Sequence, residues 1–232
     1  MKRSFVPLFI CIAVLATRAS GQDNQSQAAS ASFLPDAYYK NLNTSLPVYN
    51  GRVFDSYPPD IEGNALTPAD HWAPITVLYE GVWYNVFGRY DQHADELVIR
   101  NPDSTCFFIP NRDRISRFVM EGRIFVKMDP GIVSSQGGYY EMISDGEFAV
   151  FVKRYMLLHE DISGPTVQRD FAPQYTYFVR KNGQFHQVRT KSNLLALVPE
   201  KKSLVQKELK NQKIKFGSDP EAAIRIAAGF YK

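Results

Sequence analysis

Glycine-bearing turns between runs of β-branched and aromatic residues constrain the fold of this chain most. The stretch YYEMISDGEFAVFVKRYMLL, from Tyr139 to Leu158, places two apolar runs on either side of Asp145-Gly146. Asn-Gly and Asp-Gly favour type I′ turns, because both central residues of such a turn have positive φ. The chain has five such turns, two of them in the weaker Glu-Gly form: Asn50-Gly51, Glu80-Gly81, Glu121-Gly122, Asp145-Gly146 and Asn182-Gly183. They predict five hairpins and an antiparallel meander of about ten strands.

The run FAVFVKRYMLL predicts a strand that is covered on both sides. Its apolar residues alternate between two faces, with Phe148, Val150 and Val152 on one and Ala149 and Phe151 on the other. A single sheet with one face in water would not explain this pattern. We therefore expect an α+β, mainly β protein, whose curved sheet is either barrel-like or packed in two layers.

The hydrophobic period changes after Arg189, which predicts two or three short helices at the C-terminus. Pro199 is suited to the first turn of one helix, in which Leu204, Val205 and Leu209 share a face. Ser218 or Asp219 is expected to cap the last helix, ahead of Pro220. We expect this last helix to dock on the sheet through three apolar residues, which are Ala222, Ile224 and Phe230. The expected β domain is residues 33–189, and the helical cap is residues 190–232.

The N-terminus has the layout of a secretory signal peptide. Lys2 and Arg3 precede a short apolar run, and small residues follow, so cleavage is expected after Gly21. Residues 22–32 (QDNQSQAASAS) are polar and small, and we interpret them as a disordered tether. No other segment is long and apolar enough to predict a transmembrane helix. The mature chain is thus expected in the periplasm or outside the cell, and peripheral attachment to the outer membrane stays open.

Charge is distributed unevenly along the mature chain. The signal peptide carries Lys2, Arg3 and Arg18 without any acidic residue, so its removal leaves a neutral chain. Between residues 180 and 215, however, ten basic residues stand against two acidic ones. Two interpretations stay open: the solvated side of amphipathic helices, or a patch that binds an anionic surface or an acidic partner. The lysines chosen as candidate binding residues are Lys201, Lys202, Lys207 and Lys210.

The densest polar cluster is RYDQHADELVI. On an extended strand Asp91, His93 and Asp95 would point the same way and could hold a divalent metal. The alternative is a solvated loop between two strands. The sequence lacks a nucleophile elbow, a phosphate-binding loop and a dinucleotide fingerprint, which argues against an enzyme. An envelope hydrolase that uses this metal or a carboxylate pair is therefore the alternative function. No cofactor is expected.

Aromatic residues gather in and beside the predicted strands. Adjacent aromatic residues on a strand place one ring on each face, and core packing accounts for most of them. A tyrosine-lined outer face would instead bind a glycan or peptide. Tyr139 and Tyr140 are the candidate binding residues for this second interpretation.

The export signal, the hairpins in YNGRVFDSY and YFVRKNGQFHQV, and the ending KKSLVQKELKNQKIKFGSDPEAAIRIAAGFY resemble exported proteins of unknown function from Gram-negative bacteria. The resemblance implies the compartment and no catalytic residues. The expected function is therefore that of a non-enzymatic cell-envelope protein that binds a protein partner or an anionic envelope surface. No nucleic-acid partner is expected.

Overall fold

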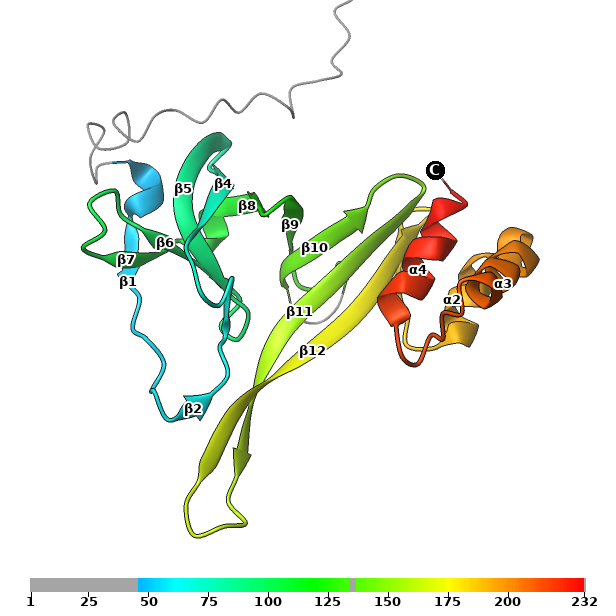
Figure 1. Ribbon diagram of the computed structural model, residues 1–232. Coiled ribbons are helices and arrows are strands. Elements are labelled where there is room, and N and C mark those ends of the chain that lie inside the picture. The colour runs from blue at the N-terminus through cyan, green and yellow to red at the C-terminus, as the bar shows by residue number, and fades with distance from the viewer. Residues whose placement is uncertain (1–45, 134–136, 232) are drawn as a thin grey trace, which may run out of the picture. The chain divides into compact units, whose positions relative to one another are not determined.

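The structure is a computed structural model that describes residues 46–133 and 137–231 (Figure 1). The expected signal peptide, residues 1–21, and the expected tether, residues 22–32, lie outside the described residues. The described chain is mainly β, as predicted, and three short α-helices follow the last strand. No helix among residues 46–133 and 137–231 has the length and apolarity needed to cross a bilayer.

The strands form one antiparallel meander with the order β1-β7-β6-β5-β4-β8-β9-β10-β11-β12-β13, and two short strands pair off this path. Since β1 and β13 end the order without pairing, the sheet does not close on itself. The strands before the turn at Glu121 are β1 (Gly51–Val53), β2 (Ile61–Glu62), β3 (Leu66–Thr67), β4 (Ala73–Tyr79), β5 (Val82–Asp91), β6 (Glu96–Arg100), β7 (Phe107–Pro110) and β8 (Ile115–Met120). The later strands are β9 (Arg123–Met128), β10 (Gly138–Ser144), β11 (Phe148–Asp161), β12 (Gln168–Lys181) and β13 (Gln184–Gln187).

Four of the five predicted hairpins are confirmed. The turns at Glu80-Gly81, Glu121-Gly122 and Asn182-Gly183 join β4 to β5, β8 to β9 and β12 to β13, and both residues of each turn have positive φ. The turn at Asp145-Gly146 joins β10 to β11, with a register shift between Met142 and Ser144. The two Glu-Gly turns therefore have the same positive-φ pair as Asn182-Gly183, with glutamate at the first position.

The predicted hairpin at Asn50-Gly51 is wrong. The chain enters the fold as the 3₁₀ helix η2 (Pro47–Tyr49), which buries Val48 and Tyr49, and Gly51 then pairs with Pro110 of β7. A Cβ at Gly51 would lie 2.0 Å from the carbonyl oxygen of Ile109. This glycine therefore allows two backbones to approach closely, which is a different use of the same residue type.

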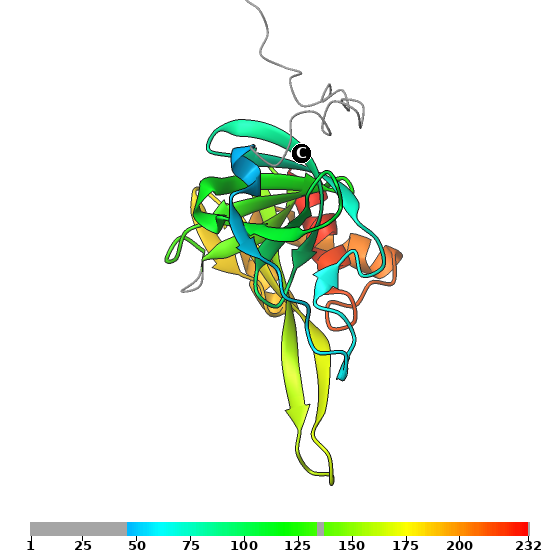
Figure 2. The same cartoon turned by 90° about the vertical axis from the view of Figure 1, so that its left-hand side faces the viewer.

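The longest hairpin has no Asn-Gly or Asp-Gly signal. The strands β11 and β12 pair from Phe148 with Lys181 to Asp161 with Gln168, and the loop between them contains Gly164-Pro165. Figure 2 shows their outer part as a two-stranded ribbon. The short strand β2 pairs with β12 there, in parallel, through Ile61 and Arg169. This contact connects the N-terminal part of the described chain to the ribbon.

Both faces of β11 are buried near its start, as predicted. Phe148, Val150 and Val152 pack with the C-terminal helices, whereas Ala149 and Phe151 pack with Phe178 of β12, Tyr140 of β10 and their neighbours. A separate core lies between β4, β5, β8 and β9, where Ile75, Tyr90, Phe118 and Phe125 are at most 1% exposed. Burial of both faces stabilises the start of β11 by removing apolar surface from water.

The helices are α2 (Lys191–Leu197), the 3₁₀ helix η4 (Pro199–Lys201), α3 (Lys202–Asn211) and α4 (Pro220–Gly229). Asp219 caps α4 by accepting a hydrogen bond from the backbone N–H of Ala222 at 2.9 Å. As predicted, α4 docks on β11 (Figure 1) and buries Ile224. Its other buried residues are Ala223, Ala227 and Ala228, whereas the predicted Ala222 and Phe230 are only partly buried, because they lie beside the docking face.

Candidate functional site

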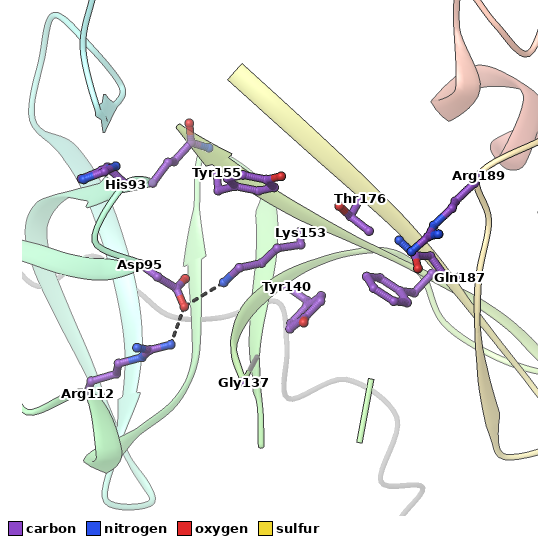
Figure 3. A pocket seen from close by; sticks show the side chains of 12 residues that line it. His93, Asp95, Arg112, Gly137, Tyr140, Lys153, Tyr155, Thr176, Gln187 and Arg189 are labelled. Carbon is purple, nitrogen blue, oxygen red and sulfur yellow. Dashed lines mark hydrogen bonds and ion pairs between the residues drawn. The ribbon is translucent and has the colours of Figure 1, made fainter. Parts of the chain in front are cut away.

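A groove of about 590 Å³ crosses the middle of β11 and β12 (Figure 3). One wall comes from the turn between β5 and β6 and from Arg112, which follows β7. The floor consists of side chains from β10, β11 and β12, and the other wall is the end of β13 with Gln187 and Arg189. Cavities of this size are typical of sites for small molecules.

The turn between β5 and β6 holds its shape through Asp91. The Asp91 carboxylate accepts hydrogen bonds from the backbone N–H groups of His93 and Ala94, both at 2.9 Å, and from the hydroxyl of Tyr57 at 2.7 Å. The turn then lies along the edge of β11, because the Met156 N–H donates to the carbonyl of Gln92 at 3.2 Å. Asp91 therefore shapes this wall, and its side chain does not line the groove.

Asp95 is the centre of a charged cluster at one end of the groove. Its carboxylate forms ion pairs with Arg112 and with Lys153, whose Nζ lies 2.7 Å from Oδ2, and it accepts a hydrogen bond from the hydroxyl of Tyr90. The backbone N–H of Tyr139 also donates to this carboxylate at 3.3 Å. We call Asp95, Arg112, Lys153 and Tyr90 the Asp95 cluster. Its two cations share a single carboxylate, so the cluster is positively charged overall.

Burial shifts the pKa of two members of the Asp95 cluster, Lys153 and Tyr90. Desolvation lowers the pKa of Lys153, and the neighbouring Asp95 acts in the opposite direction. The pKa of Tyr90 is raised well above its usual value, first by burial and then by Asp95, so this residue is a neutral O–H donor.

The ammonium group of Lys153 is fully engaged in local contacts. It also donates to the carbonyl of Tyr139 at 3.2 Å and lies 5.3 Å from the ring centre of Tyr140. These contacts make Lys153 a structural cation that joins β10 to β11, rather than a free base.

The proposed metal set is not assembled. Asp91 ends β5, whereas His93 and Asp95 lie in the turn that follows it, so the expectation that all three point the same way from one extended strand is wrong. Asp91 bonds to the turn and Tyr57, Asp95 bonds to Arg112 and Lys153, and Nδ1 of His93 lies 2.9 Å from the Met156 carbonyl. Within the described ranges, no group of three or more His, Cys, Asp or Glu side chains is placed to hold a metal ion.

The candidate tyrosines are buried on opposite faces of β10. Tyr139 is 1% exposed and packs against Tyr90 and Phe118, whereas Tyr140 is 2% exposed and packs against Phe178. The prediction that adjacent rings face opposite sides is therefore confirmed, but neither ring is part of an exposed tyrosine face. Tyr140 does line the floor of the groove.

Sequence reasoning missed the residues at the other end of the groove. Tyr155 lies on the same face of β11 as Phe151, and Thr176 lies on the same face of β12 as Phe178, whereas Arg189 follows β13. Strand alternation from Phe151 could have found Lys153 and Tyr155. Arg189 had no such signal, since its position depends on where β13 ends.

The second candidate is an exposed surface on α3. Val205 and Leu209 are buried, as predicted, and Lys202, Lys207 and Lys210 are exposed. We call these three lysines, with Lys213 just after the helix, the lysine face. Lys201 is half-buried. Leu204, which was expected to share a face with Val205 and Leu209, is 47% exposed because it lies outside the stripe formed by those two residues.

The two candidates differ in what they can bind. The groove presents fixed polar groups around aromatic rings, which suits a small polar molecule. The lysine face presents charges without a pocket, which suits an extended anionic surface. No family model, curated protein or solved structure matches this chain.

Proposed function

We propose that this chain is an exported, non-enzymatic protein of the cell envelope that binds an anionic surface through the lysine face. The observation that carries the proposal is the set of exposed ammonium groups on one side of α3. Within the described part of the chain, Lys202, Lys207 and Lys210 have no carboxylate partner, and the nearby Glu208 bonds to Asn211 and Gln212 instead. Export rests on the N-terminal signal, which lies outside the described residues.

Lysine chemistry favours a charged surface over a protein interface. An ammonium group is compact and strongly hydrated, and lysine is depleted from the cores of protein–protein interfaces. An anionic lipid surface attracts each lysine near it by about 1 kcal/mol without removing its water. Leu204 is 47% exposed and precedes Lys207 by three residues, so it adds an apolar side chain at the edge of the lysine face. We therefore favour phosphate-bearing lipid over a protein partner.

The proposal is tested by co-sedimentation with phosphatidylglycerol-containing vesicles. The Lys207→Glu, Lys210→Glu double variant should bind at least about tenfold more weakly, because four units of charge change at the surface. The matched control is the Arg114→Glu, Arg117→Glu double variant, which makes the same charge change at two exposed residues of another surface. Equal losses in the two double variants, or no binding by the unchanged protein, would contradict the proposal. In a pull-down from envelope extract, a protein captured equally well by the unchanged protein and by both double variants would indicate a partner that uses another surface.

A further inference from the structure

The two ends of the groove differ in whether their charges are satisfied. At one end, Arg112 and Lys153 are turned toward Asp95 (Figure 3). At the other end, no described residue accepts a hydrogen bond from the guanidinium of Arg189, whose backbone N–H bonds to Asn193. We propose that the groove binds a carboxylated sugar, with the sugar carboxylate paired to Arg189. This inference uses none of the lysine-face residues.

Charge favours an anion in this groove. Three cations and one carboxylate line it, and the carboxylate of Asp95 is already engaged by Arg112, Lys153 and Tyr90. An incoming anion therefore meets the open guanidinium of Arg189 and little repulsion from Asp95. A guanidinium presents two parallel N–H donors, which match the two oxygens of a carboxylate.

The remaining groups around Arg189 suit hydroxyls. Thr176 contributes a hydroxyl and Gln187 an amide, and neither side chain has a hydrogen-bond partner among the described residues. Figure 3 shows Arg189 and Gln187 side by side across the groove from Lys153. Groups that both donate and accept are what a ring bearing several hydroxyls requires.

Aromatic rings supply the apolar contact that a sugar ring also needs. Tyr155 is 36% exposed and lies on the same side of β11 as Lys153, so part of its ring is open to a ligand. Tyr140 and Phe178 form the floor nearby, with Tyr140 beneath the ammonium group of Lys153. The apolar face of a sugar ring can lie on such a surface while its hydroxyls reach the groups at the rim. A purely apolar ligand would leave these polar groups without partners.

Isothermal titration calorimetry of the purified protein with digalacturonate tests this inference directly. The neutral disaccharide of galactose is the control for the carboxylates, and galactose phosphate is the control for the type of anion. The protein variants are Arg189→Gln, which removes the charge, and Tyr155→Leu, which removes the ring but keeps an apolar side chain. Arg117→Gln is the matched control, because Arg117 is an exposed arginine that does not line the groove.

We expect digalacturonate to bind the unchanged protein and the Arg117→Gln variant equally. Binding by Arg189→Gln should be at least about tenfold weaker, because charge-assisted hydrogen bonds to the carboxylate are lost. Tyr155→Leu should also weaken binding, and the neutral disaccharide should bind as weakly as digalacturonate binds Arg189→Gln. No binding of digalacturonate at millimolar concentration, equal binding of the neutral disaccharide, an unchanged affinity in Arg189→Gln, or binding of galactose phosphate alone would each overturn the inference.

Discussion

Gly138 of β10 lies so close to Asp95 that a Cβ at position 138 would force the Asp95 carboxylate to move. A Cβ atom there would lie 1.9 Å from Oδ2 of Asp95, and the φ of Gly138 is +134°. The backbone approaches this closely because the next residue, Tyr139, donates its N–H to the Asp95 carboxylate. Glycine at position 138 is therefore a condition for the Asp95 cluster.

The Gly138→Ala variant should be less stable by at least about 3 kcal/mol, because the change adds backbone strain to a steric clash with the cluster. Urea unfolding measures the loss. Gly183→Ala is the matched control: Gly183 also has positive φ, +76°, but nothing lies within 4 Å of its added Cβ. This control should cost only about 1–2 kcal/mol, the strain of the left-handed conformation. Equal losses in both variants would show that the clash with Asp95 is not real.

Removal of the Asp95 charge should destabilise the fold, because two cations share this one carboxylate. Lys153 and Asp95 are 13% and 14% exposed at the side chain, and their polar atoms are 2.7 Å apart. We expect Asp95→Asn to destabilise the fold by about 3 kcal/mol, because a largely buried ammonium group loses its partner. Adding Lys153→Met should recover part of this loss. A double-mutant cycle measures the coupling between the two residues, and strictly additive losses would contradict it.

Glu141 should make stability depend on pH. Burial alone would raise the pKa of this carboxyl, but hydrogen bonds from Arg123 and Arg154 outweigh burial and hold the pKa below its usual value. A carboxyl with a lowered pKa in the folded state stabilises the fold above its unfolded pKa of about 4.3, and this contribution is lost as pH falls through the folded pKa. Glu141→Gln should therefore be clearly less stable than the unchanged protein at pH 7, and the difference should shrink in acid. Chemical unfolding at several pH values checks this, and a constant difference would contradict it.

The docking of α4 should depend on Ile224. This side chain is fully buried against β11 and its neighbours, so Ile224→Ala should cost about 2–4 kcal/mol of stability through lost contacts and a cavity. The matched control is Leu204→Ala on α3, because Leu204 is 47% exposed and its truncation should leave stability almost unchanged. Thermal unfolding of both variants gives the comparison. Similar losses would mean that α4 does not dock as described.

Local chemistry explains which parts of the fold could be predicted. The hairpins at Glu80-Gly81, Glu121-Gly122 and Asn182-Gly183 follow from positive φ at the turn, which neighbouring residues alone determine. The pairing of Gly51 with Pro110 is a contact between distant segments, so the local signal at Asn50-Gly51 was misleading. The turn of the β11–β12 hairpin was not identified, because its loop carries Gly164-Pro165 and not the Asn-Gly or Asp-Gly pair that marks a two-residue turn.

The candidate sites also combine features that local sequence predicts with features that depend on distant contacts. The exposed lysines of α3 follow from helical period, which places Val205 and Leu209 on the buried side. The direction of Asp95 could not be predicted, because its partners Arg112 and Lys153 come from distant positions in the chain. Nor could the burial of Tyr140, which depends on packing against Phe178. Periodicity predicts which residues share a face, but it does not predict which distant residues cover that face.

The salt dependence of vesicle binding tests the central claim most directly. Raising ionic strength from about 0.01 M to about 0.15 M shortens the screening length from about 30 Å to about 8 Å, which weakens attraction between exposed charges. The protein should bind phosphatidylglycerol vesicles at low salt, lose most of that binding at the higher salt, and bind phosphatidylcholine vesicles at neither. Binding that is equal for the two lipids, or that does not change with salt, would contradict a function based on the lysine face.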